Sequence, residues 1–80
     1  MHLVTVTLRH EAGEPPAEAG RIAAVLRAVA RPEHGLEHAY VQPAAFGAVA
    51  VLFLVAPTLD AAQRSAAELV DLVEDALRER

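Results

Sequence analysis

The chain has 80 residues, no cysteine and a formal net charge of −4. Its seven basic residues are all arginines, and they are scattered along the chain. This length predicts one small domain over residues 1–80. The absence of cysteine excludes disulfides, thiolate metal sites and thiol catalysis. The acidic balance disfavours nucleic-acid binding, because no basic stripe is present to neutralise phosphates.

Hydrophobic residues make up 54% of the chain, too many for a disordered protein. For so small a domain, this indicates that apolar surface remains after one core is filled. The longest apolar run, residues 44–57, is shorter than the roughly 20 residues of a membrane span. The N-terminal residues alternate in polarity and do not resemble a signal peptide. We therefore expect a cytoplasmic protein with no membrane partner.

Residues 2–9 predict the first strand, because apolar and polar residues alternate and several are β-branched. One face carries Val4, Val6 and Leu8, and the other carries Leu3, Thr5, Thr7 and Arg9.

Residues 17–31 predict a helix with one buried stripe, formed by Ile22, Val25, Leu26 and Val29. Gly20 lowers the stability of this helix, and we expect it to permit close approach of a neighbour. Pro32 ends the helix, because it disfavours helical geometry at the preceding residue.

Residues 36–42 predict the second strand, with alternation placing Leu36, His38, Tyr40 and Gln42 on one face. Residues 46–56 are apolar on both faces, which is typical of a central strand covered on both sides. Residues 59–79 predict a long amphipathic helix with Thr58 as its N-cap and Asp60 in its first turn. Glu74 and Arg78 have the spacing of an ion pair on this helix.

These elements define a βαββα chain of the α+β class, a split βαβ that resembles a ferredoxin-like fold lacking its last strand. Connection rules predict an antiparallel sheet of order 1-3-2 with both helices on one face. The sequence leaves open which row of the third strand faces the helices. One row is Val49, Val51, Phe53 and Val55, and the other is Ala48, Ala50, Leu52 and Leu54.

The predicted fold leaves the free edge of the first strand and one sheet face uncovered, and such surfaces are usually covered in nature. We therefore expect a homo-oligomer, in the simplest case a dimer, formed through the open face or the free edge. A peptide or protein partner could also add as a strand at that edge. The candidate ligand or interface residues are His38, Tyr40, His10, Thr5, Thr7 and Phe53.

His34 and His38 have the spacing of two zinc ligands on a helix, but Pro32 and Gly35 favour extended backbone here. Four residues of a strand span about 13 Å, too far for two imidazoles to share one ion. We expect no metal, no cofactor and no catalytic residue. His10, with Glu11 and Glu14, could supply acid and base groups, although a solvated loop is the simpler interpretation.

Three hypotheses for function follow. The first is a self-associating protein-interaction or regulatory module without catalysis of its own. The second is a small-molecule-binding protein or small dimeric enzyme with its site at the sheet face or dimer interface, built on His38, Tyr40 and His10. The third is a subunit of a larger assembly, in which the C-terminal helix docks on a partner. Few aromatic rings and the negative charge disfavour RNA binding.

Overall fold

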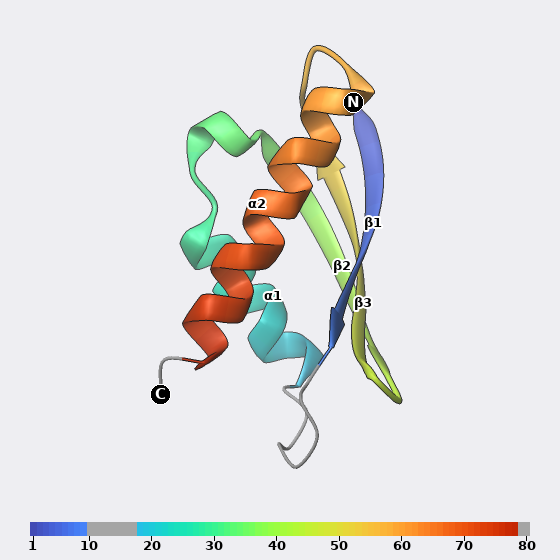
Figure 1. Cartoon of the computed structure of the whole chain (residues 1–80), viewed down its shortest axis with the longest axis vertical. Coiled ribbons are helices and arrows are strands. Elements are labelled where there is room, and N and C mark those ends of the chain that lie inside the picture. The colour runs from blue at the N-terminus through green and yellow to red at the C-terminus, as the bar shows by residue number, and fades with distance from the viewer. Residues whose placement is uncertain (10–17, 79–80) are drawn as a thin grey trace.

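A computed structural model describes residues 1–9 and 18–78 of the chain (Figure 1). Its three strands form one antiparallel sheet in the order β1-β3-β2, as the sequence predicts. The fold is α+β, with the split βαβ arrangement of a ferredoxin-like domain. The elements are β1 (His2–Arg9), α1 (Ala19–Val29), the short 3-10 helix η1 (Pro32–His34), β2 (Leu36–Ala44), β3 (Gly47–Leu54) and α2 (Leu59–Arg78).

The structure shows which of the two apolar rows of the central strand β3 is buried. Its even-numbered residues are at most 1% exposed and belong to the core; they are Ala48, Ala50, Leu52 and Leu54. The odd-numbered residues Val49, Val51 and Phe53 are only half-buried. The row with two alanines therefore faces the core, and the bulkier row faces outward.

Both helices contribute to this single core. Ile22 and Leu26 from α1 share one buried cluster with four residues of α2 and the even-numbered row of β3. Figure 1 shows α1 and α2 on the same side of the sheet. The buried residues of α2 are Ala62, Ala66, Leu69 and Val73. Helix α2 lies against β1 of the sheet and beside α1.

Strand β2 departs from the predicted alternation at its start. A β-bulge separates Leu36, which is opposite Leu54, from His38, which is opposite Phe53. The extra residue shifts the side-chain alternation by one position. Leu36 consequently packs against the core, and the expectation that it shares a face with His38 is wrong.

Three local expectations also need correction. No atom lies within 4 Å of a methyl group placed on Gly20, so this glycine permits no close approach. Arg78 pairs with Asp75, at 3.3 Å, instead of Glu74. Helix α1 ends at Val29 because Ala30 and Arg31 have extended backbone geometry, as expected for residues close before a proline.

The N-terminus of α2 is capped as predicted. The backbone N–H of Ala61 donates to the Thr58 hydroxyl oxygen at 3.0 Å, which satisfies one of the free donors of the first turn. Asp60 lies in that turn and forms an ion pair with Arg64. Neither helix of the described ranges combines the length and apolarity that crossing a membrane requires.

Candidate interaction surface

One side of the sheet, here called the open face, carries no helix of residues 1–9 and 18–78 (Figure 1). The register places the outward residues of the three strands side by side: Thr5 lies opposite Val51, and Tyr40 lies opposite the same valine from the other strand. The open face consists of Leu3, Thr5, Thr7 and Arg9 from β1, Val49, Val51 and Phe53 from β3, and His38, Tyr40 and Gln42 from β2.

The centre of the open face is apolar. Val49, Val51 and Phe53 form its middle row and are half-buried only by their neighbours within the sheet. Leu3 and Tyr40, on the two flanking strands, are each 59% exposed. Large apolar side chains gathered on one exposed face of a small domain indicate an interaction surface.

Three rings cluster at one end of the open face. The ring centroids of His38 and Tyr40 lie 4.6 Å apart, and those of Tyr40 and Phe53 lie 5.8 Å apart, in edge-to-face geometry. His38 and Phe53 complete the triangle at 6.0 Å. Such arrangements match the positive edge of one ring to the negative face of another. The cluster fixes the ring orientations before any partner binds.

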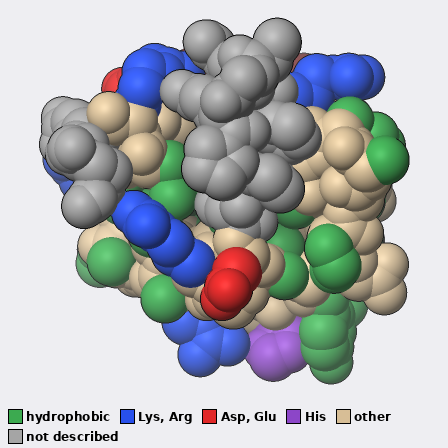
Figure 2. Space-filling view, turned by 90° about the horizontal axis from the view of Figure 1, so that it is seen from below, with side chains coloured by type: hydrophobic (Ala, Val, Ile, Leu, Met, Phe, Trp, Pro, Cys, Tyr) green, Lys and Arg blue, Asp and Glu red, His purple; other side chains and the backbone are tan. Residues whose placement is uncertain are grey.

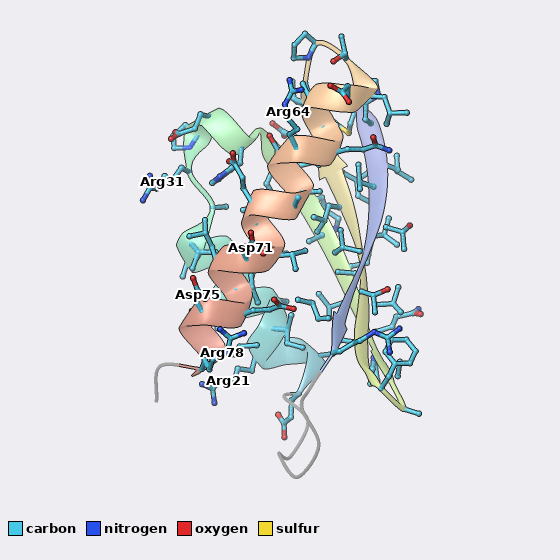
Figure 3. All side chains as sticks on the ribbon, viewed as in Figure 1. Arg21, Arg31, Arg64, Asp71, Asp75 and Arg78 are labelled. Carbon is cyan, nitrogen blue, oxygen red and sulfur yellow. The ribbon has the colours of Figure 1, made fainter. Side chains whose placement is uncertain are left out.

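Charge is concentrated away from the open face. Figure 3 shows the labelled arginine and aspartate side chains, among them Arg64, Asp71 and Asp75, on the helix side of the molecule. Among the described residues of the open face, only Arg9, at the end of β1, carries a formal charge; its guanidinium lies 5.2 Å from the centre of the exposed Phe46 ring. Viewed along the long axis, hydrophobic side chains reach the surface between arginines (Figure 2).

A cleft of about 400 Å³ lies between the end of α1, η1 and the start of β2. Arg27 and Arg31 contribute to its wall from the helix side, and Glu37 and His38 contribute from the strand. The cleft therefore adjoins the aromatic cluster through His38. The wall thus contains two arginines and one glutamate, and arginine is the residue that pairs with carboxylates and phosphates through several parallel hydrogen bonds.

His34, the last residue of η1, is buried. Its side chain is 6% exposed; Nδ1 accepts a hydrogen bond from the backbone N–H of Arg31 at 3.0 Å, and Nε2 lies 3.3 Å from a carboxylate oxygen of Glu68. Because Nδ1 accepts, neutral His34 carries its proton on Nε2. The residue ties η1 to α2 and acts as a structural support.

Five of the six candidate residues come together. Thr5, Thr7, His38, Tyr40 and Phe53 all lie on the open face. The sixth, His10, and its neighbours Glu11 and Glu14 lie outside the described residues. Within residues 1–9 and 18–78, no three histidine, aspartate or glutamate side chains gather closely enough to hold a metal ion.

Fold and surface together define an α+β arrangement with one sheet face that neither α1 nor α2 covers. Comparison with protein-family models found no matching family. Comparisons with curated proteins and with solved structures likewise gave no match.

Proposed function

We propose that this chain is a small cytoplasmic interaction module that acts without catalysis of its own and self-associates by packing its open face against that of a second copy. The observation that carries the proposal is the apolar row of Val49, Val51 and Phe53, flanked by the exposed Leu3 and Tyr40. Covering such a row is favourable by about 25 cal/mol for each Å² of apolar area removed from water.

The size of the face supports a weak dimer. Three strands about 4.8 Å apart and eight residues long at about 3.4 Å each cover about 14 by 27 Å, or about 400 Å² in projection. This is about half of the roughly 800 Å² per partner that is standard for specific interfaces, a size typical of weak or transient contacts. We therefore expect association in the micromolar range.

The charge distribution supports a second copy as the occupant. The open face is neutral apart from Arg9 at one end and, when protonated, His38 towards the other. A two-fold axis lying between the sheets and perpendicular to the strands places the two Arg9 side chains at opposite ends of the interface. The neutral valine and threonine rows then face each other, so that no like charges are buried together.

Light scattering across a dilution series tests the proposal. We expect a mass of at least two protomers at tens of micromolar that falls on dilution. Val51→Lys places a charge at the centre of the open face and is expected to weaken face-to-face association at least tenfold. Ala67→Lys adds the same charge on an exposed position of α2 and serves as the matched control. A wild-type chain that is monomeric at these concentrations, or a Val51→Lys variant that associates like wild type, would contradict the proposal.

A second candidate function is the binding of a small anionic molecule in the cleft beside His38. The specific observation is the pair of arginines, Arg27 and Arg31, in its wall. A thermal-shift screen with carboxylates and phosphorylated metabolites tests it. Stabilisation that is lost in Arg27→Gln and in His38→Ala would support binding there, and unchanged melting with every compound would reject it.

A further inference from the structure

The two outer edges of the sheet differ in their protection against strand addition. The edge strand β2 contains Pro43 and the bulge near Glu37, and both features interrupt the regular hydrogen bonding that another strand would need. The opposite edge strand β1 pairs with β3 in unbroken register from His2 to Arg9. It contains no proline, no bulge and no lysine.

The backbone polar groups of β1 that point outward can be assigned from the sheet. The N–H of Val55 donates to the carbonyl oxygen of Gly35, on the β2 side, at 2.8 Å. Successive residues of a central antiparallel strand direct their backbone N–H and C=O groups to one neighbouring strand and then to the other. The even-numbered residues of β3 therefore direct these groups to β1. Their partners in β1 are also even-numbered. The odd-numbered residues, including Leu3, Thr5 and Thr7, therefore direct N–H and C=O to the free edge.

Apolar side chains remain uncovered on both sides of this edge. Val4 and Val6 pack against the core from the helix side, yet they are only half-buried. Leu3, on the open face, is 59% exposed. A strand laid beside β1 would cover apolar surface on both sides while it satisfied the outward backbone groups.

We propose that β1 pairs in antiparallel orientation with β1 of a second copy, which joins two sheets into one of six strands. Side-chain alternation restricts the register, because core-facing residues must lie opposite core-facing residues. Of the registers that meet this condition, the two that pair the most residues of β1 place the two-fold axis through Thr5, with Val4 opposite Val6 of the second copy, or through Val6, with Val6 opposite itself. Either register separates the two Arg9 residues by about 20–27 Å.

This edge contact goes beyond the proposed face-to-face association and does not depend on it. The edge uses outward backbone groups of β1 together with Val4 and Val6, whereas the face uses the side chains around Val51. A protomer can make both contacts at once. The two together predict assemblies of more than two protomers, and loss of either contact leaves the other intact.

Engineered thiols test the edge contact directly, because the chain has no cysteine of its own. Opposed core-facing residues would lie about 4.5 Å apart between Cα atoms, which is within disulfide range. With the axis at Val6, Val6→Cys alone forms a cross-linked dimer under mild oxidation. With the axis at Thr5, only a mixture of Val4→Cys and Val6→Cys does so. Ala67→Cys, on the exposed side of α2, measures random collision.

Cross-linking above the Ala67→Cys level in either experiment supports the proposal, and its absence in both overturns it. Face-to-face packing cannot produce these cross-links, since Val4 and Val6 lie on the helix side. Thr5→Pro provides a second measurement: the Thr5 N–H points outward, so the variant should keep its circular dichroism and lose the edge contact. Because the Thr5 side chain lies on the open face, Thr5→Ala, which keeps the N–H, controls for the loss of that side chain. If a folded Thr5→Pro variant keeps the wild-type mass while Val51→Lys dissociates, the edge proposal fails and the face proposal stands. If instead Thr5→Pro dissociates while Val51→Lys keeps the wild-type mass, the face proposal fails and the edge proposal stands.

Discussion

Replacing His34 by alanine tests how η1 is held to the rest of the domain. The imidazole is almost completely buried, accepts the backbone hydrogen bond of Arg31 through Nδ1, and places Nε2 3.3 Å from Glu68. Alanine removes the acceptor, the contact with α2 and most of the buried volume. We expect a clear loss of stability with little change in secondary structure, because η1 comprises only three residues.

The magnitude follows from three contributions. Loss of a side-chain acceptor that caps a helix costs about 1 kcal/mol. Removal of a buried ring that is incompletely replaced by its neighbours costs about 1–2 kcal/mol more. The contact with Glu68 contributes little, since that carboxylate is 69% exposed and exposed ion pairs are screened by water. The total is about 2–3 kcal/mol, or about 10–20 °C in the melting temperature of a domain of this size.

Urea denaturation followed by circular dichroism measures the effect, at one protein concentration because self-association also stabilises the folded state. His34→Asn restores an acceptor for the Arg31 N–H and should recover about 1 kcal/mol. Gln63→Ala, at an exposed position of α2 away from the open face, serves as the control and should change the free energy of unfolding by less than about 0.5 kcal/mol. If His34→Ala behaved like Gln63→Ala, the structural role assigned to His34 would be wrong.

Further substitutions test the remaining packing assignments, each by urea denaturation. Gly20→Ala should stabilise by about 0.5–1 kcal/mol, because a helical residue gains a methyl group in open space; destabilisation would contradict the assignment. Gly47→Ala should cost about 2–3 kcal/mol, since Gly47 has a φ of 146° and its new methyl group would collide with the Leu8 carbonyl oxygen. Thr58→Ala should cost about 1 kcal/mol through the lost cap, with Thr58→Ser close to wild type. Leu52→Ala should cost about 2–5 kcal/mol, as expected for a fully buried leucine; a cost below 1 kcal/mol would contradict its place in the core.

The topology was predictable because the two kinds of strand have different patterns. Strict alternation in β1 indicates one buried face, and continuous apolarity in β3 indicates a central position. With antiparallel connections, these patterns leave the order β1-β3-β2. Alternation also predicted that Thr5 and Thr7 of β1, and His38 and Tyr40 of β2, lie on the open face.

Other features were not predictable from local pattern. Both rows of β3 are apolar, so burial of the Leu52 row became evident only with the helices in place. The bulge before His38 has no distinctive local sequence, since Glu37 fits either a regular strand or a bulge. The burial of His34 depends on its contact with Glu68, more than thirty residues later in the chain. The spacing of Arg31 and His34 around Pro32 is the one local signal that could have indicated a capped turn.

The bulge in β2 allows Leu36 and His38 to lie on opposite sides of the sheet, although they are two residues apart. In a regular strand, Leu36 and His38 would have to occupy the same side of the sheet, so that either a leucine would be in water or an imidazole would be in the core. The additional residue allows Leu36 to anchor the strand internally while His38 remains outside with Tyr40. Shortening the chain by Glu37 alone should therefore force a choice between these two placements, and it would alter the aromatic cluster without touching any of its three rings.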